Sequence, residues 1–268
     1  MSDQNTTPPA ENTPPANDAE QNRMPPPLFY KEPRPVTADA HGDFKIRPTF
    51  DFAHANQTNA VPLTLPEFVL SARHYPIVFV GKDLVPTAAL GFRPDQNVFV
   101  DDNGTWEKFC YVPAYVRRYP FILLGRPGDE RLQLGIDHEA KSSASDARAL
   151  FNGEKETETV TEALDMCQQF HGAYQATAEF SNMLKESGLM EERTLEVDIA
   201  DGEKIDIGAF ASINEQKLRE VPDETFLEWR KKGWLAAMYF HVASLNNWEQ
   251  IMGRLPEAQQ KNPASLTT

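Results

Sequence analysis

Two stretches of the chain carry the same pattern of apolar and polar positions, 44 residues apart. Each reads Tyr-Pro, a run of apolar residues, a glycine, a polar turn and a second run that ends in Leu-Gly, over residues 73–92 and 117–136. Six of their twenty aligned positions are identical, where roughly one is expected for unrelated segments. Short apolar runs that do not alternate, and that follow a proline, are typical of strands covered on both faces. The pattern predicts two equivalent β-hairpins that lie together.

A third hairpin is predicted between these two, over residues 97–109. Asn103-Gly104 is a dipeptide that type I′ turns favour, because both of its positions then take a positive φ. The acidic residues before it also suggest a calcium loop, but two positions where such a loop needs acidic ligands hold Phe99 and Cys110. We therefore interpret this segment as a turn.

The second half of the chain switches to helical spacing. A helix is predicted behind a capping box at Thr159-Val-Thr-Glu162, with Gly188 as its left-handed C-cap. Its inward stripe is expected to hold Val160, Leu164, Cys167, His171, Tyr174, Ala178 and Ser181.

Further along, alternating residues at 195–199 and 204–207 predict one hairpin around Asp201-Gly202. Helical spacing resumes at Asp223, bends at Gly233 and continues over 234–252. Most strands thus precede most helices, which favours the α+β class, with a hairpin repeat in the first half and helices plus one hairpin in the second.

Both ends of the chain differ from its middle in composition. Residues 1–27 hold seven prolines and no Val, Ile, Leu, Phe, Tyr or Trp. Such a segment buries too little surface to offset its chain entropy, so we expect a disordered arm. Residues 256–268 are polar and aperiodic and are expected to form a flexible tail. The range between them, 28–255, fits a single domain.

The formal net charge of −14 lies in one region, because residues 137–228 carry 22 acidic against 8 basic side chains. An acidic half repels phosphate backbones, and the chain has no glycine-rich phosphate loop, so nucleic acid is not expected as a partner. No apolar run is long enough to span a membrane, and the start lacks the apolar centre of a secretory signal. With only two cysteines, the sequence favours a cytoplasmic location.

The candidate recognition surface is the stretch 106–121, in which six of sixteen residues are aromatic. Aromatic faces beside arginines suit a peptide carboxylate, a sugar ring or a protein partner. The candidate binding residues are Trp106, Tyr111, Tyr115, Arg117, Arg118 and Tyr119. The alternative is that these aromatic rings build the core between the hairpins.

No catalytic residue is predicted, and no cofactor. His41-Gly-Asp43 has the spacing of a facial-triad iron site, which needs a second nitrogen ligand from elsewhere. Asp137-His138-Glu139 is better interpreted as a polar strand end, because adjacent strand residues point to opposite faces. Cys110 and Cys167 stand among apolar neighbours, which raises a thiol pKa and lowers its reactivity.

Several short pieces together resemble the SapC family over about residues 28–254. They are Pro27–Tyr30, Val61–Leu63, Glu67-Phe68, Tyr75–Phe79, Tyr111–Pro120 and the stretch from Pro222 to His241. The family is named for a bacterial surface-layer system, and its members are often neighbours of outer-membrane uptake receptors. The resemblance implies a cell-envelope or nutrient-uptake context and brings no catalytic residues with it.

These observations lead to three functional hypotheses. The first is a non-catalytic binding or accessory protein whose partner is a protein or small ligand of the envelope or uptake system. The second is a metal-dependent, oxygenase-like enzyme that uses His41 and Asp43. The third is a structural component of a surface layer. The oligomeric state stays open.

Overall fold

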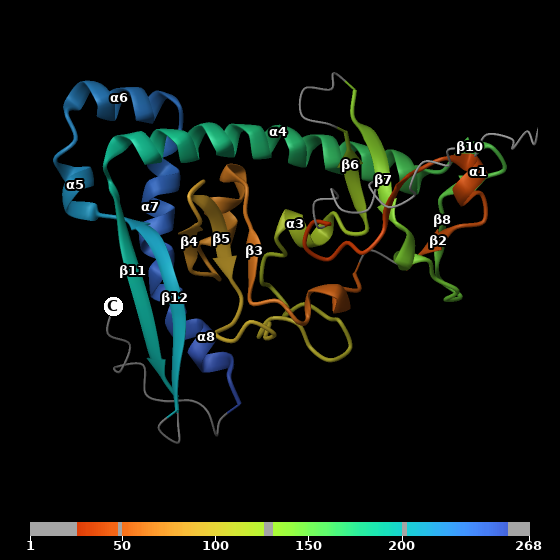
Figure 1. Ribbon diagram of the computed structural model, residues 1–268, viewed down its shortest axis with the longest axis horizontal. Helices are drawn as coiled ribbons and strands as arrows, with labels where there is room; N and C mark the ends of the chain where they lie inside the picture. Colours follow the sequence, from red (N-terminus) through yellow and green to blue (C-terminus); the bar gives the residue numbers. More distant parts are fainter. Residues whose placement is uncertain (1–25, 48–49, 126–130, 200–202, 257–268) are drawn as a thin grey trace, which may run out of the picture.

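The computed structural model describes residues 26–47, 50–125, 131–199 and 203–256 (Figure 1). It contains both helices and sheets, with most strands before most helices, which confirms the α+β class. The predicted arm lies outside the described residues except for 26–27, and so does the predicted tail except for Pro256. Among the described helices, none has the length and apolar character needed to cross a membrane.

The larger sheet has five antiparallel strands in the spatial order β11-β12-β4-β5-β3. Its strands are β3 (Ala60–Pro62), β4 (Ile77–Val80), β5 (Val85–Ala89), β11 (Met190–Asp198) and β12 (Lys204–Ile213). β11 and β12 pair along nearly their whole lengths, which confirms the two strands of the hairpin predicted from alternation, while its predicted turn at Asp201-Gly202 lies outside the described residues. β12 and β4, by contrast, share one paired position, Ala211 with Phe79.

The smaller sheet has three strands in the order β1-β7-β6. They are β1 (Pro33–Pro35), β6 (Phe121–Leu124) and β7 (Gln133–Asp137). Two short ribbons lie beside this sheet, and they pair β2 (Lys45–Ile46) with β8 (Arg148–Ala149) and β9 (Phe151–Asn152) with β10 (Lys155–Glu156).

One long helix, α4 (Glu158–Ser187), packs against both halves of the molecule. Figure 1 shows it passing β6 near its start and reaching β11 at its end. Its first turns place Val160 and Cys167 in the smaller of two apolar cores, and its last turns place Phe180 and Leu184 in the larger one. The helix ends at Gly188 with a φ of 69°, as predicted.

The other helices are short. They are α1 (Ala38–His41), α2 (Phe68–Ser71), α3 (Ala114–Arg117), α5 (Glu215–Arg219), α6 (Asp223–Lys231), α7 (Trp234–Ser244) and α8 (Trp248–Arg254). Gly233, with a φ of 75°, separates α6 from α7, which confirms the predicted bend. The predicted helix over 234–252 is interrupted by a 3₁₀ turn at Leu245–Asn247.

The two repeat copies do form hairpins, but they are not equivalent and do not share a sheet. β4-β5 belongs to the larger sheet and β6-β7 to the smaller one. In the first copy, Ile77 pairs with Ala88. In the second copy, Phe121 is the equivalent of Ile77, but it pairs with Ile136, which lies four residues beyond the equivalent of Ala88. The connection between β6 and β7 is longer than that between β4 and β5, and this shifts the register. The two copies are therefore similar in sequence but differ in which residues pair.

The predicted third hairpin is wrong in its details. Residues 97–109 contain one bridge, Val100 with Trp106, instead of two strands. Gly104 has a φ of 76°, but Asn103 is not in the left-handed region, so the turn is not of type I′. The Asp101 carboxylate accepts hydrogen bonds from the backbone N–H groups of Asn103 and Thr105, and this side chain shapes the loop instead.

The start and the inward face of α4 also differ from the prediction. The helix begins at Glu158, with Thr157 rather than Thr159 as its N-cap. Tyr174, expected inward, is 49% exposed, while Phe170, which is not part of the predicted stripe, is buried. The first half of the helix packs into the smaller core and the last turns into the larger one. Its buried residues therefore do not form a single continuous stripe.

Candidate ligand-binding site

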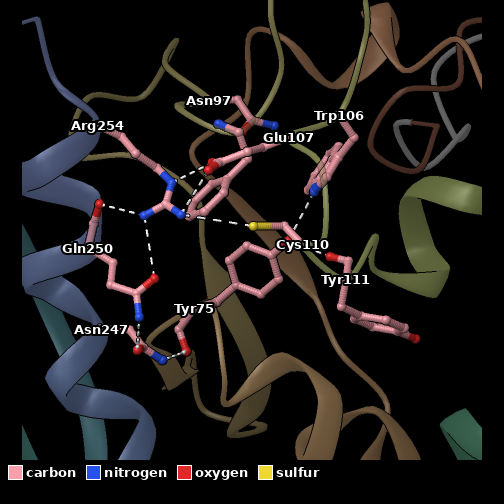
Figure 2. Close-up of polar contacts among 10 residues, drawn as sticks. Tyr75, Asn97, Trp106, Glu107, Cys110, Tyr111, Asn247, Gln250 and Arg254 are labelled. Carbon is pink, nitrogen blue, oxygen red and sulfur yellow. Dashed lines mark hydrogen bonds and ion pairs between the residues drawn. The ribbon is translucent and has the colours of Figure 1, made fainter.

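The six predicted binding residues do not form one surface. Trp106 and Tyr115 are buried, with 5% and 8% of their area exposed. The Trp106 indole N–H donates to the Tyr75 hydroxyl over 3.0 Å, and that hydroxyl donates to the Tyr111 carbonyl (Figure 2). For Trp106 the core interpretation is therefore correct, because its ring joins the larger core and its one polar atom is already satisfied.

The same region holds Cys110 in a structural network. Arg254 of α8 pairs with the Glu107 carboxylate and lies 3.9 Å from the Cys110 sulfur (Figure 2). Burial raises the pKa of the Cys110 thiol, and burial raises that of Cys167 to about 11. Both thiols are thus protonated at neutral pH, which agrees with the low reactivity expected from their surroundings.

The remaining predicted residues surround α3, whose position is set by a buried carboxylate. Glu67 accepts hydrogen bonds from the backbone N–H and hydroxyl of Thr64, as the second half of a capping box. Its other oxygen accepts from the Tyr111 hydroxyl at 3.0 Å and from the Ala114 N–H at 2.6 Å. Glu67 therefore anchors the first residue of α3 and fixes where the arginines at the other end of that helix lie.

Three of the predicted residues, Arg117, Arg118 and Tyr119, line a cleft of about 360 Å³. Its walls also include residues of α4, Glu162 and Met166 among them, and residues beside the β2-β8 ribbon. The volume lies within the range of roughly 300–1,000 Å³ that is usual for small-molecule sites. We call this space the basic cleft.

Basic side chains predominate among the charged residues of the basic cleft. Its cations are Arg47, Arg117, Arg118, Lys141 and Arg148, and its carboxylates are Asp51, Glu139 and Glu162. Arg47 is paired with Asp51 at 2.6 Å, and Lys141 with Asp43 at 3.2 Å. Within the described part of the chain, the other three cations have no carboxylate within 4 Å. The cleft therefore has positive charge available for an anion.

Arg118 is the most enclosed of these cations. Its guanidinium carbon lies 4.2 Å from the centre of the Tyr115 ring and 4.4 Å from that of Phe170. Its Nε is buried and has no hydrogen-bond partner among the described residues. Contact with aromatic rings compensates part of the cost of taking the charge partly out of water, but it gives the Nε–H no conventional acceptor.

Tyr119 and His54 form the neighbouring wall. Their rings stack with centroids 4.3 Å apart. His54 Nε2 lies 3.2 Å from the Val116 carbonyl oxygen, to which it can donate a hydrogen bond. Burial lowers the pKa of His54 to about 4, so the imidazole is neutral at pH 7. The Tyr119 hydroxyl donates a hydrogen bond to buried Asp137 over 3.2 Å. Burial, and to a lesser extent the charge of Asp137, raises the pKa of Tyr119. The His54 and Tyr119 side chains of this wall are therefore both neutral at pH 7.

The iron-site hypothesis is not supported by the positions of its two residues. The His41 side chain is fully buried, whereas the Asp43 side chain is 88% exposed and paired with Lys141. Asp137, the last residue of β7, accepts hydrogen bonds from the N–H groups of Lys31 and Glu32 and is a structural anchor. Across the described ranges, no group of three potential metal-ligating side chains comes together.

Sequence reasoning missed two residues that shape the site, Glu67 and His54. Thr64-Leu-Pro-Glu67 has the T-x-x-E spacing of a capping box, so Glu67 carried a signal that could have been found. His54 carried none, because its stacking partner lies 65 positions away and becomes a neighbour only in the folded chain.

We compared the chain with known proteins. No curated protein and no solved structure matches it. A family model does match, and it covers residues 36–251, which includes α1, the whole basic cleft and most of α8. Because that match spans most of the sequence and agrees with the pieces quoted above, the chain belongs to the SapC family.

Proposed function

We propose that this protein is a non-catalytic binding or accessory protein and that the basic cleft binds a ligand through an anionic group. Membership of the SapC family supports a cell-envelope or nutrient-uptake context for that ligand or for a protein partner. The proposal concerns Arg117, Arg118 and Tyr119 of the original candidates, since these line the cleft.

One observation carries the proposal, and it is the state of Arg118. A guanidinium taken partly out of water normally has a carboxylate or several carbonyl groups as acceptors, because burying an unpaired charge is costly. Arg118 is partly buried against two aromatic rings, and its Nε, which is buried, has no partner in the described structure. A ligand carboxylate or similar anion in the cleft would supply the missing acceptors, in the two-pronged geometry that arginine favours.

The charge pattern of the whole chain supports the same choice. The formal net charge of −14 lies in residues 137–228, so an extended polyanion is repelled by that part of the chain. Arg117 and Arg148 add two further cations to the cleft that have no carboxylate partner among the described residues, although Arg117 already donates to the Val112 carbonyl and the Tyr111 hydroxyl. A local positive site in an acidic protein favours a small anion that can enter the cleft over an extended polyanion, which would also meet the acidic surface.

Titration with hexanoate, and with hexanamide as its neutral analogue, tests the proposal. Isothermal titration calorimetry or ligand-observed NMR should detect hexanoate binding at millimolar concentration, with the amide weaker by about tenfold or more. Arg118→Gln should weaken hexanoate binding by about tenfold or more while hexanamide binding hardly changes. The matched control is Arg230→Gln, an exposed arginine on α6 outside the cleft, which should leave both affinities unchanged.

If Arg118→Gln does not fold, as judged by circular dichroism, Arg148→Gln serves in its place. Arg148 is exposed and lines the cleft, so its loss should weaken hexanoate binding a few-fold without unfolding the protein. Equal binding of the acid and the amide, or no binding of either, would overturn the proposal.

A further inference from the structure

A second hollow lies on the other side of Arg118. It has a volume of about 450 Å³, and its walls include Pro62, Val85, Ile122, Leu123 and Phe170. Arg118 is the residue that lines both this hollow and the basic cleft. It is also the one permanently charged side chain among the described residues of the second hollow, which we call the apolar groove.

Helix α4 makes one wall that is continuous between the two spaces. Thr159, Glu162, Ala163 and Met166 line the basic cleft, and Cys167, Phe170, His171 and Tyr174 line the apolar groove. These positions recur every three or four residues and therefore share one side of the helix. At 1.5 Å per residue, the stretch from Thr159 to Tyr174 is about 22 Å long. The two hollows thus follow each other along α4, which packs against β6 (Figure 1), and we call the two together the trough.

The two parts of the trough have opposite chemistry. The basic cleft holds Arg117 and Arg148, which have no carboxylate partner among the described residues, whereas the walls of the apolar groove are mainly aliphatic and aromatic carbon. At the boundary, the Arg118 guanidinium lies against both the Tyr115 ring and the Phe170 ring. The Phe170 ring in turn stacks on Tyr174, with centroids 6.4 Å apart, toward the far end of the groove.

We propose that the ligand of the site is a free long-chain fatty acid. Its carboxylate would pair with Arg118 on the side of the basic cleft, and its acyl chain would lie along the apolar groove toward Tyr174. The inference rests on the proposed function and names the ligand class for it. Charge complementarity selects the carboxylate, while the groove offers few polar groups to pair with a peptide backbone or a sugar.

A series of carboxylates of increasing length, each below its micelle-forming concentration, tests the inference on the full chain. A buried methylene contributes about threefold to fourfold in affinity, so dodecanoate should bind at least about a hundredfold more tightly than hexanoate. Dodecan-1-ol, which has the chain without the charge, should bind about tenfold or more weakly than dodecanoate. Arg118→Gln should weaken the binding of both acids.

A matched pair of tyrosines tests the groove itself. Tyr174 lines the apolar groove and is 49% exposed, and Tyr239 on α7 is outside it and 50% exposed. Tyr174→Ala should weaken dodecanoate about threefold to tenfold and leave hexanoate unchanged, because only the longer chain reaches that ring. Tyr239→Ala should change neither affinity. Both substitutions are at half-exposed positions, so the fold should persist.

The possible results separate this inference from the proposed function. If hexanoate binds in an Arg118-dependent way but dodecanoate binds no more tightly, the proposed function stands and the fatty-acid inference is overturned. If dodecan-1-ol and dodecanoate bind equally and Arg118→Gln has no effect, the groove takes apolar chains without the cation, and both are overturned. If none of these probes binds, both are likewise overturned.

Discussion

His241 links two strands of the larger sheet that hardly pair with each other. Its Nδ1–H donates to the Ile77 carbonyl over 2.7 Å, and its Nε2 accepts from the Ile213 N–H over 3.0 Å. β4 and β12 share one paired position, so this imidazole from α7 takes the place of strand-to-strand hydrogen bonds. The arrangement needs a neutral ring, because one nitrogen donates while the other accepts.

Acid should therefore weaken the fold through His241. The side chain is fully buried, and burial lowers its pKa to about 4 from the usual 6.5. Because the folded-state pKa is the lower one, the unfolded chain binds the proton more readily, and stability falls as the pH drops below 6.5. From these two values, about 2 kcal/mol of unfolding free energy is lost between pH 7.5 and pH 5, and about 3 kcal/mol by pH 4.

Urea unfolding of the wild type and of His241→Gln, at pH 8.5, 7.5 and 5.0, measures this loss. At pH 7.5 the variant should be less stable, because one amide cannot reproduce both hydrogen bonds of the ring. The gap between the two proteins should be constant from pH 8.5 to 7.5 and should shrink by about 2 kcal/mol at pH 5, since the variant has no proton to gain there. A gap that stays the same at pH 5 would refute the reasoning and show that His241 remains neutral or finds another acceptor on protonation.

Two further substitutions test how the cleft walls are built. Gly104→Ala should cost about 2–3 kcal/mol in urea unfolding, because its φ is 76° and a methyl group there would lie 2.5 Å from a carboxylate oxygen of Asp51. Gly81→Ala, with a φ of 67° and open space around it, should cost only the backbone part, about 1–2 kcal/mol, and equal costs would contradict the clash. Glu67→Gln should lower stability by about 2–4 kcal/mol and weaken hexanoate binding, because the single oxygen of the amide can serve only one side and leaves one backbone N–H, that of Thr64 or that of Ala114, without an acceptor. An unchanged unfolding midpoint in that variant would show that the carboxylate does not anchor α3.

Elements that depend on near neighbours were predicted well. The β11-β12 hairpin follows from alternation over a few residues on each side of one turn. The end of α4 at Gly188 and the bend at Gly233 follow from the ease with which glycine takes a positive φ. In each case the residues that decide the conformation lie within about one turn of one another, so the printed sequence contains the whole cause.

The candidate site could be predicted only in part. Interleaved arginines and aromatic residues marked Arg117, Arg118 and Tyr119, and the cleft includes all three. The same pattern also marked Trp106, which is buried because its indole N–H has a partner in Tyr75, 31 residues earlier. Local composition does not distinguish an aromatic ring with a buried partner from one beside a cleft, since both look alike in the sequence.

The amino-acid sequence alone determined the α+β class, the acidic half and the resemblance to the SapC family, because composition, periodicity and short motifs are properties of the chain itself. Only the tertiary structure decided that the two repeat copies enter different sheets. β12, the partner of β4, lies more than a hundred residues from it, and β1, the partner of β7, lies more than ninety residues from it. It also decided that Arg118 is partly buried against Phe170 of α4, a segment some fifty residues further along the chain, with no carboxylate beside it among the described residues. The burial of Arg118 and the pairing of the two repeat copies depend on distant segments that the fold brings together, so the residues next to them in the sequence do not determine either.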